Sequence, residues 1–419
     1  MRPLLVWLTL FLTPQAGAPS AELQAVVNSA KFKTAAAALD RDFDRHVAET
    51  IRLTEIPAPP FKEAERAKVY AELFRQHGLS DVEIDAEGNV LGLRRGAGQG
   101  PLVAIAAHLD TVFPEGTNVK VRRDGTKLAA PGVGDDSRSL AVLLAIIRAL
   151  DAAQIQTKAD ILFVGDVGEE GPGDLRGMKY LFSKGKYAGK ITAFISADGT
   201  DPGNEIVSVA VGSKRYRVTF KGPGGHSYSD FGLVSPAFAM ANAMKKFGAL
   251  SVPKSPKTTF SVGVVGGGTS INSIPFETWM DVDMRSESRD ELNKLDAAFK
   301  AVVAEAVNEE NAARSTASGK ITADLKLTGD RPSGTMPANS RIVEIASASI
   351  RHFGLTPVLA SGSNDSNFPI SLGIPAITLD AGGASDRNHS LDEWIDIAKP
   401  SALRGMQMML ATLVTLAGM

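Results

Sequence analysis

The chain contains no cysteine among its 419 residues. This absence excludes disulfide bonds, thiolate metal sites, a cysteine nucleophile and a lipoprotein anchor. The sequence also lacks a basic block, because 45 Lys and Arg residues are balanced by 47 Asp and Glu residues. Proteins that bind nucleic acids usually carry a clustered basic surface, so we expect no nucleic-acid partner.

The first 20 residues have the three parts of a secretory signal. Arg2 gives a charged start, LLVWLTLFL is an apolar run, and Ala16-Gly17-Ala18 resembles a cleavage site. The apolar run is shorter than a typical transmembrane helix. We therefore expect a cleaved signal at residues 1–20 and an exported protein, periplasmic or secreted, without stable membrane association. An uncleaved anchor helix is the alternative.

Apolar strand-like runs alternate with helical stretches through most of the chain. The runs are 103–107, 160–165, 193–196 and 374–379. Such alternation is typical of an α/β fold, with a mixed, mostly parallel sheet flanked by helices. We assign two segments, 21–206 and 329–419, to one domain of this class.

Residues 207–328 have a different pattern. The segments 216–220 and 279–284 alternate apolar and polar side chains, which indicates strands with one solvated face. A helix begins near Ser235 and a longer one runs from Arg289, and two further strands are expected at 258–265 and 321–327. The order of elements is therefore β-α-β-β-α-β. This order is that of a ferredoxin-like α+β domain, which we expect to be inserted into the larger α/β domain.

Histidine and acidic residues follow the apolar strands, where ligands bind in α/β sheets, and a pair of aspartates precedes a predicted helix. These residues are His108, Asp110, Asp135, Asp136, Glu169, Glu170, Asp198 and His389. Taken singly, each has an ordinary structural explanation, such as a helix cap or a solvated acidic loop. Together, two histidines and several carboxylates suit a divalent cation, zinc above all, with cobalt or manganese as alternatives.

Several motifs occur in the order and approximate spacing of a known family. They are HLDTVFP, GVGDDSRS, GEEGPGDLRG, the Ala-Asp198-Gly step, GPGGHS and NHSLDEW. The chain thereby resembles the co-catalytic dizinc metallopeptidases, which include peptidase T, glutamate carboxypeptidase, succinyl-diaminopimelate desuccinylase and the aminoacylases. The match covers essentially the whole mature chain, and the GEEG and DLRG segments look most like the peptidase T branch.

The resemblance implies a zinc-exopeptidase fold with two zinc ions per chain. One ion would be bound by His108 and Asp198, and the other by Glu170 and His389. Asp135 would bridge the two ions.

The resemblance also implies roles for neighbouring residues. Glu169 would be the general base and acid, and Asp110 would orient His108. The peptide bond between Asp135 and Asp136 would be cis.

The inserted domain would supply a dimer interface and further groups to the site. By resemblance, His226 in GPGGHS would stabilise the oxyanion in the partner subunit of a homodimer. Asn272 and Arg285 would bind the carboxylate of the substrate, which suits a guanidinium group. An ordinary surface position is the alternative for Arg285.

Two segments depart from the common pattern of this family. Ser137-Arg138-Ser139 replaces the usual Lys-Gly, and Gly171-Pro172-Gly173 replaces Thr-Gly-Ser. Neither change removes a ligand, but both bear on the substrate pocket. The sequence predicts an exported zinc-dependent exopeptidase that hydrolyses short peptides by metal-activated water with a glutamate general base. The alternatives are an N-acyl amino acid deacylase and, from another class, a non-catalytic peptide-binding protein.

Overall fold

The computed structural model describes residues 18–98, 100–199 and 203–419. The predicted signal lies outside this range except for residues 18–20, which belong to helix α1 (Ala18–Asn28). Among the described residues, no helix combines the length and the apolar composition that crossing a membrane requires.

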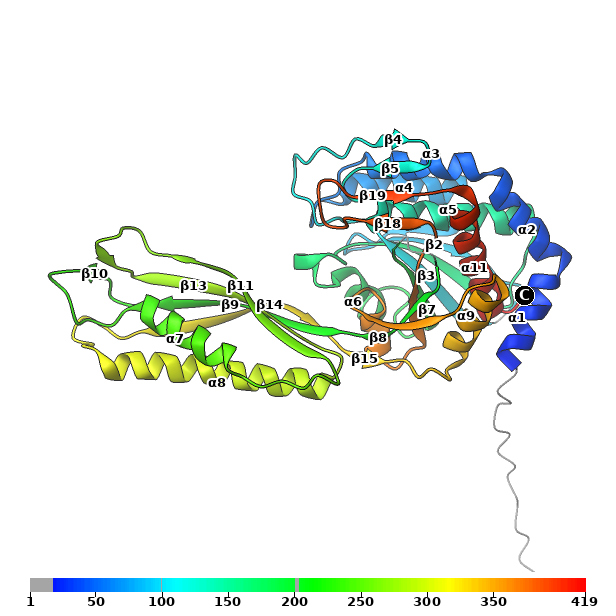
Figure 1. Cartoon of the computed structure of the whole chain (residues 1–419). Helices are drawn as coiled ribbons and strands as arrows, with labels where there is room; N and C mark the ends of the chain where they lie inside the picture. The colour runs from blue at the N-terminus through cyan, green and yellow to red at the C-terminus, as the bar shows by residue number, and fades with distance from the viewer. Residues whose placement is uncertain (1–17, 99, 200–202) are drawn as a thin grey trace, which may run out of the picture.

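The larger domain is built around a nine-stranded mixed sheet (Figure 1). The strand order is β1-β2-β6-β3-β7-β17-β8-β15, with β16 beside β8. The strands are β1 (Ser80–Ile84), β2 (Val90–Arg94), β3 (Leu102–His108), β6 (Asp160–Asp166), β7 (Ile191–Ala197), β8 (Glu205–Ala210), β15 (Gly334–Thr335), β16 (Val358–Gly362) and β17 (Ala376–Leu379). Strands β6, β3, β7 and β17 are mutually parallel, whereas β1, β2 and β15 pair in antiparallel fashion. The α/β prediction is therefore confirmed.

Helices pack against this sheet and bury its central strands. They are α1, α2 (Ala30–Arg41), α3 (Phe43–Thr54), α4 (Ala64–Gln76), α5 (Arg138–Ala152), α6 (Arg176–Ser183), α9 (Arg341–His352), α10 (Asn367–Ser371) and α11 (Lys399–Ala417). Helix α5 contacts β3 as well as α2 and α3, which explains why nearly all of its side chains are buried. Each leucine or isoleucine buried in this way contributes about 1.5–3 kcal/mol relative to an exposed position.

A small second sheet covers one end of the larger domain (Figure 1). Its order is β18-β19-β5-β4, and its strands are β4 (Arg122–Asp124), β5 (Lys127–Ala129), β18 (Ala384–Asp386) and β19 (Trp394–Asp396). The pairing of β19 with β5 brings the loop that carries His389 close to the loop that carries Asp135.

The inserted domain extends away from the larger domain (Figure 1). Its four-stranded antiparallel sheet has the order β11-β13-β9-β14, and helices α7 and α8 pack against the sheet. The elements are β9 (Gly212–Lys221), α7 (Pro236–Gly248), β11 (Thr258–Gly267), β13 (Glu277–Ser286), α8 (Arg289–Ala313) and β14 (Thr322–Arg331). Alternate side chains such as Val218 and Met280 enter a separate core, so the β-α-β-β-α-β prediction agrees with the structure.

The predicted boundaries of the insertion, 207 and 328, need correction. Strand β8 pairs with β16 and β17 of the large sheet, and the chain leaves that sheet only after Ala210. It returns with β15, after β14 has ended at Arg331. The error has a physical cause. Buried residues of β8 alternate with exposed or half-buried ones, so this strand resembles the half-solvated strands of the inserted domain.

Candidate metal centre

The candidate ligands gather at one edge of the large sheet. Strands β3, β6 and β7 are parallel, so their carboxyl ends meet at the same edge. His108 is the last residue of β3, Glu170 follows β6, and Asp198 follows β7. Asp135 lies in the short helical turn Val133–Ser137 before α5, and His389 lies between β18 and β19.

Asp135 lies between the two histidines. Its Oδ1 is 2.9 Å from Nε2 of His108, and its Oδ2 is 3.0 Å from Nε2 of His389. The same nitrogen of His389 is 3.1 Å from Oε1 of Glu170. Each carboxylate oxygen of Asp135 therefore faces a different imidazole, which is the arrangement expected of a bridging ligand.

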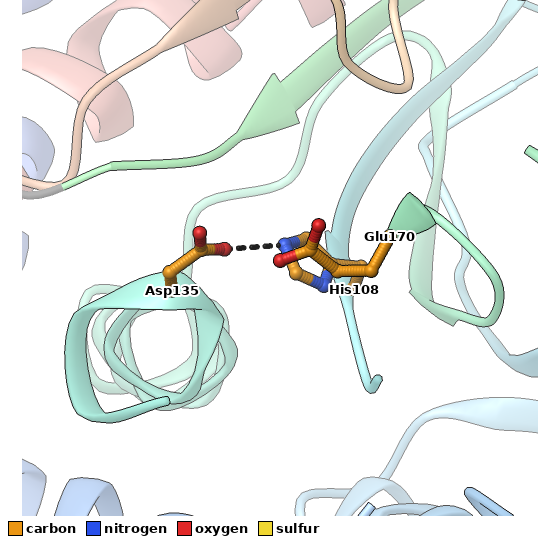
Figure 2. Close-up of side chains that lie close together, drawn as sticks. All are labelled: His108, Asp135 and Glu170. Atoms are coloured by element: carbon orange, nitrogen blue, oxygen red, sulfur yellow. Dashed lines mark hydrogen bonds and ion pairs between the residues drawn. The ribbon is translucent and has the colours of Figure 1, made fainter. Parts of the chain in front are cut away.

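His108, Asp135 and Glu170 point toward one another (Figure 2). One potential ligand atom from each lies within 4.8 Å of the others. His389 has a left-handed φ of 65°, an uncommon backbone conformation that clusters at functional sites. Imidazole nitrogen and carboxylate oxygen atoms at this spacing fit a divalent cation such as zinc.

The electrostatics of the centre also favour a bound cation. Burial, together with the nearby charge of Asp135, raises the pKa of Glu170 to about 8. Burial and Asp135 likewise raise the pKa of Asp198 to about 7, although His108 opposes this shift. These shifts report crowded carboxylates that lack sufficient positive charge in the protein itself, so a divalent cation would relieve their repulsion.

The peptide bond between Asp135 and Asp136 is cis, as predicted from the sequence. The two side chains have different surroundings. Asp136 is fully buried, and its Oδ2 accepts a hydrogen bond from the backbone N–H of His108 at 3.1 Å. Asp136 thus ties the ligand loop to the end of β3, while Asp135 faces the centre.

Asp110 has a different main contact from the predicted one. Its carboxylate accepts backbone N–H groups from Gly168, Glu169 and Glu170 at 2.9, 3.1 and 2.9 Å. Nδ1 of His108 lies 3.0 Å from the backbone oxygen of Asp110 but 3.7 Å from its Oδ1. The Asp110 carboxylate therefore organises the loop of the two glutamates, and its carbonyl group orients His108.

Glu393 is a site residue that the sequence reasoning missed. Its Oε1 accepts the N–H groups of Gly134 and Asp135 at 2.8 and 3.1 Å, and its Oε2 accepts that of Gly132 at 2.8 Å. One buried carboxylate thus holds the backbone N–H of Asp135 and those of two glycines just before it. In the sequence, this role was indicated by the position of Glu393 in the NHSLDEW motif, which also contains His389.

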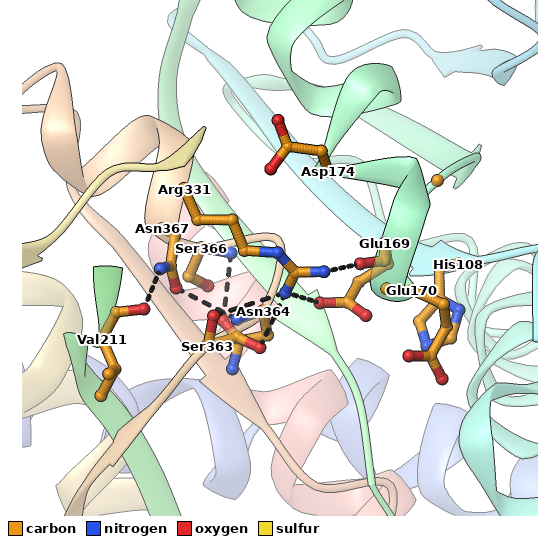
Figure 3. A network of polar contacts seen from close by, with 12 residues as sticks. His108, Glu169, Glu170, Asp174, Val211, Arg331, Ser363, Asn364, Ser366 and Asn367 are labelled. Atoms are coloured by element: carbon orange, nitrogen blue, oxygen red, sulfur yellow. Dashed lines mark hydrogen bonds and ion pairs between the residues drawn. The ribbon is translucent and has the colours of Figure 1, made fainter. Parts of the chain in front are cut away.

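Arg331 is a second missed residue, and it contacts Glu169 (Figure 3). Nη1 of Arg331 donates to Oε1 of Glu169 at 2.9 Å, and Nη2 donates to the backbone oxygen of Glu169. Nη1 also reaches the backbone oxygen of Ser363 at 3.3 Å. No local motif marks this arginine, because it lies 162 positions from Glu169.

A cleft of about 330 Å³ opens beside these groups. The described residues that line it are Val112, Asp135, Glu169, Glu170, Gly171, Asp198, Arg215, Arg285, Arg331, Ser363 and His389. Arg285, on β13, is thus brought to the same cleft as the candidate ligands. Asp283 accepts from Nε of Arg215 at 3.0 Å and from Nε of Arg285 at 2.7 Å. One carboxylate shared by two guanidinium groups leaves this wall of the cleft positively charged.

His226 and Asn272 lie in the inserted domain, and neither contributes to this cleft. His226 lies in β10 (Gly225–His226), which pairs with β12 (Ser273–Ile274), and Asn272 directly precedes β12. Strand β10 is at the far end of the inserted domain (Figure 1). Both residues are exposed, and neither is among the described residues that line the cleft. Within one chain, the structure therefore does not bring them to the metal centre.

Residues 104–415 match the sequence profile of peptidase family M20/M25/M40. A putative LysW-lysine/LysW-ornithine hydrolase of Pyrococcus abyssi is 36% identical over 119 residues, which are 28% of this chain and 32% of that protein. The chain thus matches about a third of the length of this relative.

Solved structures share the whole fold at lower identity. An aminopeptidase PepT from Bacillus cereus has a TM-score of 0.71 and 22% identity, covering 89% of this chain and 98% of the other. A dinuclear metal binding peptidase of the M20 family from Bacillus subtilis has a TM-score of 0.64 and 16% identity, with 89% and 98% covered. The fold agrees with the peptidase T-like resemblance seen in the sequence. The chain belongs to peptidase family M20/M25/M40.

Proposed function

We propose that this protein is an exported exopeptidase that hydrolyses short peptides with two bound divalent metal ions, zinc above all. The observation that carries the proposal is the position of Asp135, whose two carboxylate oxygens face two different histidines. Export, to the periplasm or the medium, rests on the N-terminal sequence pattern alone.

Five residues would hold the metal ions. His108 and Asp198 would bind one ion, Glu170 and His389 the other, and Asp135 both. Two divalent ions in such a site polarise the scissile carbonyl group and lower the pKa of the attacking water.

Glu169 would transfer the proton. It lines the cleft next to the ligand Glu170, and it accepts the proton of the attacking water and returns it to the leaving amine. Metal binding occupies Glu170, so the adjacent glutamate is the one free to accept a proton. Arg285, on the charged wall of the cleft, would bind the substrate carboxylate.

His226 would act in the active site of a partner subunit. Its Nδ1 accepts the backbone N–H groups of Tyr228 and Ser229 at 3.2 and 3.3 Å, which leaves Nε2 to donate to an oxyanion. Tyr228 and Phe231 beside it are 87% and 90% exposed. Large apolar side chains so exposed around a histidine are typical of a surface that another molecule covers, and a second copy of this chain is the proposed partner.

The experiment is a metal and substrate analysis of the full chain. Protein purified without chelator is analysed for metal and then assayed on tripeptides, dipeptides and N-acetyl amino acids, with and without chelator. We expect about two metal ions per chain and hydrolysis of peptides that chelation abolishes. Faster hydrolysis of N-acetyl amino acids than of peptides would favour the deacylase alternative. Activity that survives exhaustive chelation, or fewer than one metal ion per chain after zinc addition, would reject the proposal.

The role of His226 is tested by mixing two inactive variants. His226→Ala and Glu169→Gln are unfolded together and refolded, so that mixed dimers form. If His226 acts on the partner, each mixed dimer contains one intact site, and roughly a quarter of the wild-type activity returns. If His226 acts in its own subunit, every site carries a lesion and no activity returns.

A further inference from the structure

The loop that carries Glu169 and Glu170 is held from two domains. On the catalytic side, the carboxylate of Asp110 accepts three consecutive N–H groups of this loop. These hydrogen bonds fix the backbone at the end of β6. They do not direct the Glu169 side chain, because they involve backbone groups only.

The second set of contacts comes from the inserted domain. Arg331, the last residue of β14, contacts the carboxylate and the carbonyl group of Glu169. Arg215 of β9 donates from Nη1 to the backbone oxygen of Gly171 at 2.9 Å. The backbone N–H of Asp330 donates to Oδ1 of Asp174 at 2.9 Å.

These contacts come from the two strands by which the chain enters and leaves the inserted domain. Strands β9 and β14 are paired, with Ser213 opposite Arg331. A change in the orientation of the inserted domain would therefore move all three contacts together. The loop would move with the domain, or its contacts would break.

The contact between Arg331 and Glu169 is buried and directional. The side chains are 4% and 8% exposed, so water cannot replace either partner without rearrangement. Arg331 occupies Oε1 of Glu169, while among the described residues no hydrogen bond reaches Oε2. Because Glu169 also lines the cleft, Oε2 is the oxygen available to a water molecule there.

We propose that Arg331 is a positioning residue for Glu169, and that through it the orientation of the inserted domain determines where the general base lies. This inference rests on the proposed function, since it assumes that Glu169 transfers a proton. Arg331 touches no reacting atom. It fixes one carboxylate oxygen so that the other faces the substrate, and placement errors of about 1 Å in such groups lower rates by about 100-fold.

A matched control is present on the same sheet. Arg217 of β9 also makes a salt bridge with a carboxylate, at 2.7 and 2.6 Å to Asp281. This pair is exposed and does not contact the loop of the two glutamates. Arg217→Met therefore removes an arginine–carboxylate pair of the inserted domain without affecting Glu169.

The experiment compares Arg331→Met, Arg331→Lys and Arg217→Met in the full-length, metal-loaded protein. We expect Arg331→Met to lower kcat about 100-fold with KM changed less than about threefold, and Arg331→Lys to retain part of the activity. In a Glu169→Gln background, Arg331→Met should change the residual kcat less than about threefold, because its effect passes through Glu169. Arg217→Met should behave as wild type.

Hydrogen exchange of residues 168–174 gives a readout that does not depend on activity. We expect faster exchange of this segment in Arg331→Met and unchanged exchange in Arg217→Met. Two results would overturn the proposal. One is that Arg331→Met lowers kcat equally in the wild-type and the Glu169→Gln protein, and the other is that hydrogen exchange in Arg331→Met matches wild type. If Arg331→Met does not fold, the same comparisons with Arg331→Lys decide. A wild-type protein without chelator-sensitive hydrolysis would reject the proposed function, whereas the exchange comparison would still test the contact.

Discussion

The substitution Glu393→Gln tests whether one buried carboxylate shapes the ligand loop. Glu393 is fully buried and accepts three backbone N–H groups, from Gly132, Gly134 and Asp135. Glutamine preserves the size of the side chain, but its amide nitrogen cannot accept a hydrogen bond. Whichever oxygen is replaced, at least one N–H group then faces another donor.

The expected loss of free energy of unfolding follows from the number of hydrogen bonds that Glu393→Gln removes. Burial raises the pKa of Glu393 to about 7, so its carboxylate is charged in measurements at about pH 8. Hydrogen bonds to a charged group contribute about 1.5–3 kcal/mol each, and an unsatisfied buried donor adds about 1–3 kcal/mol. Loss of one or two bonds, partly offset by the remaining amide oxygen, should lower the free energy of unfolding by about 2–4 kcal/mol. Because the same bonds fix the backbone of Asp135, metal affinity should fall by about 10–100-fold.

Urea unfolding of the metal-free protein and competition with a zinc-binding dye measure these two quantities. Asp392→Asn is the control, since Asp392 is exposed and its side chain pairs with Arg387 and Ser390 of its own loop. It should change the free energy of unfolding by less than about 0.5 kcal/mol. A Glu393→Gln protein as stable as the control, with wild-type zinc affinity, would refute the reasoning.

Three further outcomes are expected. Glu169→Gln should retain its metal ions but lose about 100-fold or more of kcat, because Glu169 is not a ligand in the proposed site; unchanged turnover would reject its role as a base. Gly173→Ala should lower activity at least about tenfold, because a Cβ atom there would lie 2.4 Å from the Cα atom of Gly168 in the loop of the two glutamates, whereas Gly248→Ala meets nothing within 4 Å and should be neutral. The third concerns His46, which is fully buried, and whose pKa is lowered well below the ordinary value by burial and by nearby Arg138 and Arg148. The unfolded chain takes up a proton on this ring below about pH 6.5 and the folded chain does not, so the free energy of unfolding falls as the pH falls. His46→Leu should reduce the decline between pH 7 and pH 5 by up to about 2 kcal/mol in urea titrations, and an unchanged decline would contradict a neutral buried ring.

The parts of the fold that were predictable from the sequence are those that local patterns encode. Strand β3 is a run of apolar residues ending at His108, and its burial between helices follows from that composition. The half-solvated strands of the inserted domain alternate in the same direct way. Strand β8 shows the limit of such patterns, because it alternates like the inserted strands yet pairs within the large sheet. Pairing partners decide the domain to which such a strand belongs, and they are distant in sequence.

The candidate ligands were also recognisable, because each follows a strand or precedes a helix. His108, Asp135 and Glu170 do approach one another in the structure. The contact of Asp110 was less predictable. Its nearness to His108 in the sequence suggested a contact with that ring, whereas its carboxylate reaches the N–H groups of a loop about 60 positions away.

The sequence by itself therefore determined the chemical types present: histidine and carboxylate ligands without thiolates, a pair of adjacent glutamates, and an α/β domain with an inserted α+β domain. Only the tertiary structure decided which other groups hold the candidate ligands and the adjacent glutamates in place. Glu393 holds a loop 261 positions away at Gly132, and Arg331 contacts Glu169 across 162 positions. Strand and helix patterns reflect interactions between residues near one another in the chain, but a buried carboxylate or guanidinium group takes whichever partners the packing of distant segments brings within hydrogen-bond distance.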